Sequence, residues 1–240
     1  MRAFFEDSVS AADTAAALGA RLDDVRQESG TGAPESQAGE WEPLLAGERF
    51  YIVPPGFDGA TPAGRFRLEI EASTAFGTGR HETTQLCIEA LERHIRNGDT
   101  LLDVGCGSGI LLAAAGLLGA GPLLGSDISF DALTIARLHA RAPLFVGSAD
   151  AVREASFDIS IANITPRILD RLAPELKRVT KPGGLVILSG FTREQQPERF
   201  RYEEMSELGD WQCWICRPET IAADAGGMLE AGVHEADWWL

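Results

Sequence analysis

Short apolar runs alternate with segments of helical character between residues 81 and 189. The apolar runs predict strands, and they lie at residues 100–104, 123–126, 144–147, 157–162 and 185–189. The segments with helical spacing predict helices, and they lie at residues 81–96, 110–118, 130–141 and 166–180. Strands that are apolar throughout are buried on both faces, as happens when helices connect parallel strands. The alternation therefore predicts an α/β fold whose sheet is mostly parallel and covered on both faces.

The N-terminal part of the chain has a different pattern. Residues 8–28 show partial helical spacing and predict one helix, while residues 29–40 are rich in Gly, Ser and Pro and predict a linker. Residues 50–55 and 66–72 predict two short strands. Residues 1–40 are therefore expected to form a helix and a linker ahead of the main domain.

The C-terminal part also leaves the alternation. Two strand-like segments at residues 200–207 and 211–217 are separated by a Leu-Gly-Asp sequence centred on Gly209. This arrangement predicts a terminal antiparallel hairpin. The main domain is then expected to span residues 41–217, with residues 218–240 as a C-terminal extension.

The charge balance limits the partners of the chain. Its 240 residues include 36 acidic and 21 basic side chains, and the formal net charge is −15. This excess argues against binding to nucleic acid phosphates, which needs clustered Lys and Arg, and it suits a basic protein partner. The apolar stretch at residues 110–125 is broken by Gly116, Gly119 and Pro122 and is too short to span a bilayer. We expect neither a membrane span nor a secretion signal.

The four cysteines indicate a reducing environment. They are too few for a disulfide scaffold in a chain of this length, so we expect a cytoplasmic protein. Cys213 and Cys216 have the spacing of a metal or redox pair, but no second pair of Cys or His accompanies them. In a strand, residues three apart point to opposite faces. Ordinary buried thiols are therefore favoured, and no bound metal is expected.

A glycine-rich loop, Asp-Val-Gly-Cys-Gly-Ser-Gly at residues 103–109, follows the first predicted strand of the alternating region. Glycines allow a sharp turn and a close approach of a ligand to the backbone. The helix predicted from Ile110 would add free amide donors. A dinucleotide fingerprint, Gly-x-Gly-x-x-Gly, would need glycine at that position. The loop thus favours another ligand over a dinucleotide, with a tight turn that binds no ligand as the alternative.

Two acidic residues beside the loop indicate which ligand it could bind. Asp127 directly follows the next predicted strand, and its carboxylate can accept hydrogen bonds from both ribose hydroxyls of a nucleoside. Asp103, at the head of the loop, suits an ammonium group, directly or through water. Ligands of open parallel sheets bind at the carboxyl ends of the strands, where both residues are expected. S-adenosylmethionine carries a nucleoside and an amino acid but no pyrophosphate, so we predict this cofactor.

Two further residues follow later strands. Asp150 could accept the adenine amino group, or it could equally cap a helix. Asn163 follows the fourth strand, where its amide could orient a substrate amine towards the methyl group, or it could be a simple turn residue. We predict that Asn163 acts in catalysis and in cofactor binding, and that Asp150 binds the cofactor.

With these residues in place, the chain resembles the ribosomal protein L11 methyltransferases. The most specific part of the likeness is Ala-Phe-Gly-Thr-Gly-Arg-His-Glu-Thr-Thr at residues 75–84, ahead of the glycine loop. The other similar segments have the same order and spacing, at residues 101–111, 127–128, 162–164, 172–174, 182–184 and 188–190. The likeness spans roughly residues 41–217.

The resemblance implies a Rossmann-like class I methyltransferase with a seven-stranded, doubly wound sheet. It also implies that the enzyme uses S-adenosylmethionine to N-methylate amines of a protein, such as a ribosomal protein. It further implies cofactor contacts from Thr84, Gly105, Asp127 and Asn163, with Thr78 and His81 nearby, and we include all six residues, together with Gly107 and Ile128, in the predicted cofactor site. From the residues alone, His81 could also be a helix-start residue, and Thr84 could simply begin the helix. The family has a full recognition domain before its linker, and we expect residues 1–40 to be its remnant.

Two other function classes remain open at this point. The enzyme could methylate a different protein or a small molecule, with residues 1–40 and 218–240 forming a lid. The chain could instead bind the cofactor or its product without turnover, because an intact glycine loop is compatible with both functions.

Overall fold

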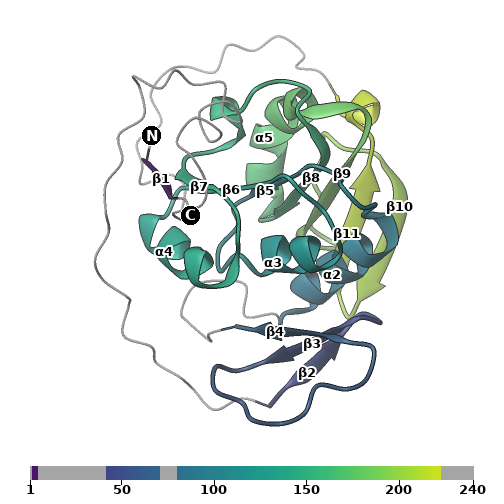
Figure 1. Cartoon of the computed structure of the whole chain (residues 1–240). Coiled ribbons are helices and arrows are strands. Elements are labelled where there is room, and N and C mark those ends of the chain that lie inside the picture. The colour runs from purple at the N-terminus through teal and green to yellow at the C-terminus, as the bar shows by residue number, and fades with distance from the viewer. Residues whose placement is uncertain (1, 5–41, 71–79, 223–240) are drawn as a thin grey trace.

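The structure, a computed structural model, describes residues 2–4, 42–70 and 80–222 (Figure 1). The predicted helix at 8–28, the linker at 29–40 and all but the beginning of the extension at 218–240 lie outside these ranges.

The main sheet has eight strands in the order β1-β7-β6-β5-β8-β9-β11-β10. Their bounds are β1 (Arg2–Phe4), β5 (Leu101–Val104), β6 (Leu123–Asp127), β7 (Leu144–Val146), β8 (Phe157–Asn163), β9 (Thr180–Thr192), β10 (Tyr202–Leu208) and β11 (Trp211–Cys216). The five strands from β7 to β9 in this order are parallel, while β11 is antiparallel to β9 and β10 is antiparallel to β11. The predicted α/β fold, its seven strands and the terminal hairpin are confirmed. The eighth strand, β1, pairs antiparallel with β7 and was not predicted.

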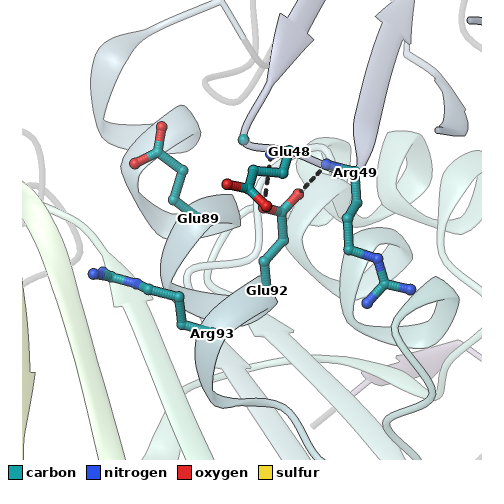
Figure 2. A pocket seen from close by; sticks show the side chains of 6 residues that line it. Glu48, Arg49, Glu89, Glu92 and Arg93 are labelled. Carbon is teal, nitrogen blue, oxygen red and sulfur yellow. Dashed lines mark hydrogen bonds between the residues drawn. The ribbon is translucent and has the colours of Figure 1, made fainter. Parts of the chain in front are cut away.

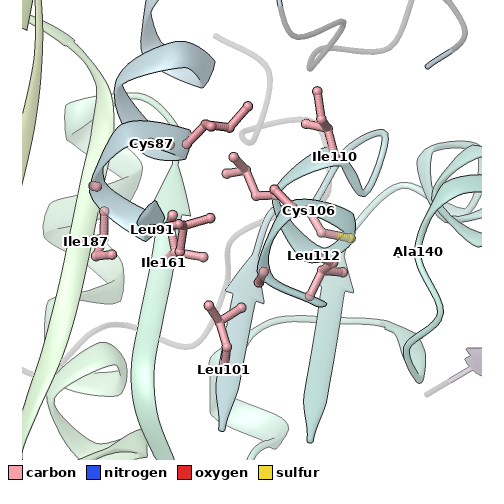
Figure 3. Packing of buried hydrophobic residues seen from close by; sticks show 14 of the residues in the cluster. Cys87, Leu91, Leu101, Cys106, Ile110, Leu112, Ala140, Ile161 and Ile187 are labelled. Atoms are coloured by element: carbon pink, nitrogen blue, oxygen red, sulfur yellow. The ribbon is translucent and has the colours of Figure 1, made fainter. Parts of the chain in front are cut away.

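Helices cover both faces of this sheet, as the apolar strands predict. On one face lie α2 (Glu82–His94), α3 (Ile110–Leu117) and α4 (Phe130–His139), and on the other lies α5 (Pro166–Val179) (Figure 1). Each face has its own cluster of buried side chains. Figure 3 shows the first cluster, which contains Leu91 of α2, Ile110 of α3 and Leu101 of β5. Two packed layers of side chains thus hold the sheet between them.

Strand β9 begins earlier than the sequence predicts. The apolar run predicts a strand at residues 185–189, but the strand starts at Thr180, which pairs with Phe157 of β8. Pro182 and two glycines follow, a pattern typical of a turn. The β8–β9 register shifts between Phe157 and Ile159, and Gly183 has a φ of 74°, so β9 begins with an irregular segment that still pairs with β8.

A second, smaller sheet precedes the main domain in the chain. It consists of β2 (Leu44–Ala46), β3 (Phe50–Val53) and β4 (Phe66–Glu69), with β2 antiparallel and β4 parallel to β3. The sequence predicted β3 and β4, in slightly longer forms, but not β2. Buried side chains of β3 and β4 belong to the same cluster as those of α2. The small sheet therefore shares a hydrophobic core with the main domain.

One carboxylate also fixes the small sheet to α2. The two oxygens of Glu92 accept the backbone N–H groups of Glu48 and Arg49 at 2.9 and 2.8 Å (Figure 2). Both donors lie in the turn between β2 and β3. Hydrogen bonds to a charged acceptor are stronger than those between neutral groups. Glu92 thus holds the β2–β3 turn against the helix.

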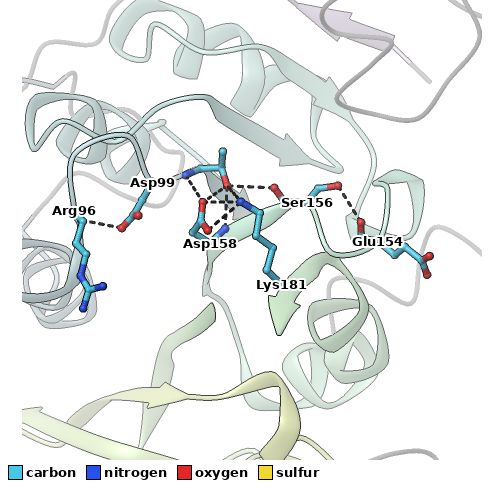
Figure 4. A network of polar contacts seen from close by, with 7 residues as sticks. Arg96, Asp99, Glu154, Ser156, Asp158 and Lys181 are labelled. Carbon is cyan, nitrogen blue, oxygen red and sulfur yellow. Dashed lines mark hydrogen bonds and ion pairs between the residues drawn. The ribbon is translucent and has the colours of Figure 1, made fainter. Parts of the chain in front are cut away.

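A polar network lies at the amino ends of the central strands β5 and β8. Asp158 accepts hydrogen bonds from the backbone N–H and the hydroxyl of Thr100, at 2.9 and 2.6 Å (Figure 4). Lys181 lies 2.9 Å from the same carboxylate. These residues tie together the amino ends of β5, β8 and β9.

The cysteines are buried and free of disulfides. Cys213 belongs to the cluster on the α2 face and Cys216 to the cluster on the α5 face. The predicted opposite orientation of these two thiols is confirmed. Within residues 2–4, 42–70 and 80–222, no group of His, Cys, Asp or Glu side chains is placed to hold a metal ion. In the same ranges, no helix has the length and apolar character needed to cross a membrane.

Candidate functional site

The glycine-rich loop forms a tight turn at the carboxyl end of β5. Gly105, Gly107 and Gly109 all have positive φ, at 76°, 52° and 77°, a conformation that residues with a Cβ rarely adopt. The N–H groups of Gly105 and Cys106 both donate to the carbonyl of Ser126 in β6, at 2.8 and 2.9 Å. Helix α3 starts directly after Gly109. The predicted sharp turn between β5 and α3 is confirmed, and it is anchored to the neighbouring strand.

Asp127 lies against this loop. One of its carboxylate oxygens accepts the backbone N–H of Gly107 at 2.9 Å, and the other accepts that of Ser129 at 2.9 Å. A carboxylate oxygen can accept more than one hydrogen bond, so both oxygens keep capacity for a ligand. Two backbone groups therefore fix the orientation of the predicted ribose acceptor.

Asp103 is buried beneath the loop, with a side chain and backbone only 1% exposed. Neither carboxylate oxygen has a hydrogen-bond partner within the described part of the chain. Burial, and to a smaller extent the negative charge of Asp127, raises the pKa of Asp103 from 3.8 to about 8. A buried polar group without a partner is costly, so this carboxyl group is suited to a cationic ligand group.

Asn163 is the last residue of β8, so it lies at the carboxyl ends of the parallel strands, where the glycine-rich loop also lies. It pairs with Ser189 of β9, and the next residue, Ile164, donates its N–H to the Ser189 carbonyl at 3.0 Å. Ile164 packs closely against two glycines. A Cβ on Gly105 would lie 2.9 Å from Ile164 Cγ2, and one on Gly190 would lie 2.5 Å from the Ile164 carbonyl oxygen. The segment after Asn163 is therefore packed directly against the glycine-rich loop.

His81 caps α2. Its Nδ1 accepts the backbone N–H of Thr83 at 3.3 Å, and its ring lies 4.5 Å from the ring of Trp211, edge to face. Trp211 pairs with Thr192 at the carboxyl end of β9, which places His81 at the edge that carries Asn163. Thr84 is buried in the first turn of α2. The helix-start role of His81 is thus present, and its contact with a cofactor remains a prediction.

The residues that follow β6 and β7 also lie at the carboxyl ends of the parallel strands. Gly147 donates its N–H to the Asp127 carbonyl at 2.9 Å, and the short helix η2 (Ala149–Ala151) follows. Asp150 lies inside η2 and is exposed, while the N-cap position is occupied by Ser148. Asp150 therefore does not act as the helix cap considered from the sequence. Ile128, directly after Asp127, is 44% exposed.

The structure brings together part of the predicted site. Asp103, Gly105 and Gly107 belong to the glycine-rich loop, Asp127 is hydrogen-bonded to it, and Asn163 directly precedes Ile164, which packs against it. Thr78 lies outside the described residues.

Three contributors were not predicted from the sequence. Ser129 holds Asp127 through its N–H and caps α4 through its side chain, which accepts the N–H of Ala132 at 3.2 Å. A serine directly before a predicted helix is a signal that could have identified it. Ile164 and Gly190 are distant in the sequence and come into contact only in the folded chain, so no local sequence pattern indicates their contact.

One cavity lies away from the glycine-rich loop, beside the small sheet. It measures about 520 Å³ and opens between the β2–β3 turn and the second half of α2 (Figure 2). Its lining is Gly47, Glu48, Arg49, Glu89, Glu92 and Arg93. These charged residues belong to the attachment of the small sheet, so we do not assign the cavity to the candidate site.

Comparison with known proteins gives a consistent family. The sequence model of the family described as ribosomal protein L11 methyltransferase (PrmA) matches residues 24–218. The ribosomal protein L11 methyltransferases of Burkholderia orbicola (strain MC0-3) and Burkholderia cenocepacia (strain HI2424) are 40% and 39% identical to this chain over 184 residues. The aligned part covers 74% of this chain and 61% of each relative. The chain therefore spans about three fifths of the length of these relatives.

A solved structure has the same fold. The crystal structure of ribosomal protein L11 methylase from Lactobacillus delbrueckii subsp. bulgaricus is 30% identical, with a TM-score of 0.67. The match covers 74% of this chain and 99% of that chain. Its fold, the sequence relatives and the family match agree, and the chain belongs to the ribosomal protein L11 methyltransferase family.

Proposed function

We propose that this chain is an S-adenosylmethionine-dependent methyltransferase that N-methylates amines of a protein substrate, ribosomal protein L11 or a similar basic protein. One observation carries the proposal. A buried carboxyl group, Asp103, has no partner within the described residues, and it lies beside a glycine turn and an oriented carboxylate, Asp127. This combination matches a ligand with both a cationic group and a pair of hydroxyls.

The residues at the edge of the sheet fit the parts of the cofactor. S-adenosylmethionine supplies a methyl group on a positively charged sulfur, carried on an amino acid and an adenosine. Asp103 would accept the ammonium group, and Asp127 would accept the ribose hydroxyls through the lone pairs that its two backbone donors leave free. Asp150 would accept the adenine amino group, with apolar Ile128 beside the base.

The remaining assigned contacts lie at the loop and at the start of α2. The turns at Gly105 and Gly107 allow close backbone approach. Thr84 and His81 would lie near the amino acid part of the cofactor. The proposal includes Thr78, as the family resemblance implies.

Asn163 would act on the acceptor side of the reaction. Its amide carbonyl can accept a hydrogen bond from an amine, while its amide donors fix its own position. The attacking amine must be neutral, and with a reference pKa of about 10.4 only a few lysines in ten thousand are neutral at pH 7. A site that removes water from the amine raises that fraction. Positioning and desolvation, with Asn163 as orienting residue, are thus the proposed catalytic contributions.

The proposed substrate follows from the net charge of the chain and from the names of its relatives. A formal net charge of −15 suits a basic protein, and ribosomal protein L11 appears in the names of the similar proteins. The four disulfide-free cysteines support a cytoplasmic location for the proposed reaction.

Calorimetry and a transfer assay test this proposal in sequence. The full chain is titrated with S-adenosylmethionine and with S-adenosylhomocysteine, and the expected result is saturable binding of both. Transfer of labelled methyl groups to purified ribosomal protein L11 is then measured, with Asn163→Ala as a variant expected to lose more transfer rate than cofactor affinity. Failure to bind either compound would reject the cofactor. Binding without transfer to any basic protein would favour a non-catalytic cofactor-binding protein, and transfer to another acceptor would correct the substrate.

A further inference from the structure

A single arginine of α5 holds the connection between β7 and β8. The guanidinium group of Arg178 donates to the backbone carbonyls of Val152, Ala149 and Asp150, at 2.7, 3.0 and 3.3 Å. These carbonyls belong to η2 and to the residue after it. The three donated hydrogen bonds therefore surround the turn that carries the Asp150 side chain.

The same helix end fixes the remainder of the connection. The carbonyl of Arg178 accepts the N–H of Ala155 at 2.8 Å, and the carbonyl of Val179 accepts that of Ser156 at 2.9 Å. The Arg178 side chain is itself restrained, because its Nε donates to a carboxylate oxygen of Glu175 at 2.6 Å. Arg178 thus contacts the connection through both its side chain and its main chain.

The turn has two backbone hydrogen bonds of its own, and its Ala149 and Val152 side chains are buried in the cluster on the α5 face. Its N-cap residue, Ser148, makes no capping hydrogen bond with its side chain. Arginine is well suited to the task, because its planar fork can donate to several carbonyls at once while lysine offers a compact charge. The backbone that carries Asp150 is therefore held from the side of α5, a helix on the opposite face of the sheet from α3 and α4 (Figure 1).

We infer that Arg178 is a positioning residue for purine recognition: by holding η2 it sets Asp150 where the carboxylate meets the 6-amino group of the cofactor base. This inference rests on the proposed function. Arg178 does not touch the cofactor, and it acts on selectivity for the base through the backbone of η2.

The test compares two ligands that differ only at that amino group. S-adenosylhomocysteine and its analogue with hydrogen in place of the adenine 6-amino group are titrated into the full chain by calorimetry. We expect the wild-type chain to prefer the amino compound by about tenfold, as for one hydrogen bond to a charged acceptor. Arg178→Met should reduce this preference to less than about threefold, and Arg178→Lys should give an intermediate value.

Two further variants separate positioning from general loss of structure. Asp150→Ala removes the acceptor and should abolish the preference, and adding Arg178→Met to it should change nothing more, because both act on the same contact. Arg171→Met, at an exposed position of the same helix, should keep the wild-type preference. If Arg178→Met does not fold, as judged by circular dichroism, the comparison of Arg178→Lys with Asp150→Ala decides.

The outcomes distinguish the inference from the function on which it rests. If the Arg178 variants bind both ligands more weakly but keep the wild-type ratio, Arg178 is merely structural and the inference is overturned. Equal affinity of the wild-type chain for both ligands also overturns it, while leaving cofactor binding intact. Binding of neither ligand by the wild-type chain rejects the proposed function, and the inference with it.

Discussion

Gly107 donates its backbone N–H to a carboxylate oxygen of Asp127 at 2.9 Å, across a separation of 20 residues. The other oxygen accepts the N–H of Ser129. The loop after β5 and the end of β6 therefore form one hydrogen-bonded unit. The orientation of Asp127 is set before any ligand binds, which reduces the entropy lost on binding.

Asp127→Asn should weaken cofactor binding by at least about tenfold. The amide has one acceptor and one donor atom, so its NH₂ group would face either the Gly107 or the Ser129 N–H. Calorimetry with S-adenosylhomocysteine measures the effect. Asp131→Asn, at an exposed position in the first turn of α4, is the matched control and should bind normally. Wild-type affinity in Asp127→Asn would contradict the assignment.

Asp103→Asn should change how stability depends on pH in the absence of cofactor. Burial raises the pKa of Asp103 from 3.8 to about 8. The folded chain therefore keeps this proton to higher pH than the unfolded chain, and the carboxyl group stabilises the fold fully below about pH 4. That contribution is lost as the pH rises towards 8.

The asparagine variant stays neutral over this range. Its free energy of unfolding, relative to wild type, should thus increase between pH 4 and 8 by at most on the order of 5 kcal/mol. Urea titrations at a series of pH values measure the difference. A difference that is constant with pH would show that Asp103 is ionised throughout.

Gly190→Ala should slow methyl transfer more than it weakens cofactor binding. Residue 190 has φ of 96°, and a Cβ there would lie 2.5 Å from the Ile164 carbonyl oxygen, so the segment after Asn163 must shift. Gly183→Ala is the control on the same strand. Its φ is 74°, but a Cβ there would meet open space. The two variants share the backbone strain, and an equal loss of transfer rate in both would rule out a specific role for the Ile164 contact.

Asp158→Asn should reduce stability at neutral pH but not at pH 2. Burial alone would raise the pKa of Asp158, but hydrogen bonds from Thr100 and Lys181 outweigh it and lower the pKa from 3.8 to about 2. The carboxylate thus stabilises the fold above about pH 4, and this is lost as the pH falls towards 2. Both Asp158 and Lys181 are more than a third exposed, so we expect a difference of no more than about 1 kcal/mol.

Chemical denaturation at pH 7 and pH 2 measures this difference. Glu154→Gln, an exposed neighbour in the same region (Figure 4), serves as control and should match wild type at both pH values. A loss in Asp158→Asn that persists undiminished at pH 2 would contradict the pKa assignment.

Glu92→Gln should loosen the β2–β3 turn without affecting the glycine loop. The glutamine retains one acceptor for two N–H donors, so the amides of Glu48 and Arg49 should exchange about tenfold faster. Hydrogen exchange measured by NMR gives both rates. Glu89→Gln, on the same helix and beside the same cavity, should leave them unchanged. Equal acceleration in both variants would mean that local charge, and not the hydrogen bonds, controls this turn.

The sequence indicated those elements whose signals are local. Apolar runs and glycines identified β5 to β8, while the three-residue strands β1 and β2 were missed because they lie outside the alternation of helices and strands that identified the equally short β7. The start of β9 was missed because Pro182 and the glycines after it are typical of a turn. In these cases pairing with a neighbouring strand outweighed the local preference.

The same distinction applies to the site. Asp103 and Asp127 could be predicted because each follows or ends a predicted strand, and parallel strands place their carboxyl ends together. Arg178 and Gly190 act through partners that are distant in sequence. No pattern within one sequence indicates such contacts, and only the folded arrangement makes them visible.

Strand β11 carries a buried thiol towards each side of the main sheet, Cys213 towards α2 and Cys216 towards α5. Each thiol can react with an alkylating reagent only when its own layer opens. The rate of modification at each position therefore reports the opening of one layer independently of the other. The alkylation rates of Cys213 and Cys216 can therefore show, without any added label, whether the helices on the two faces separate from the sheet together or one after the other.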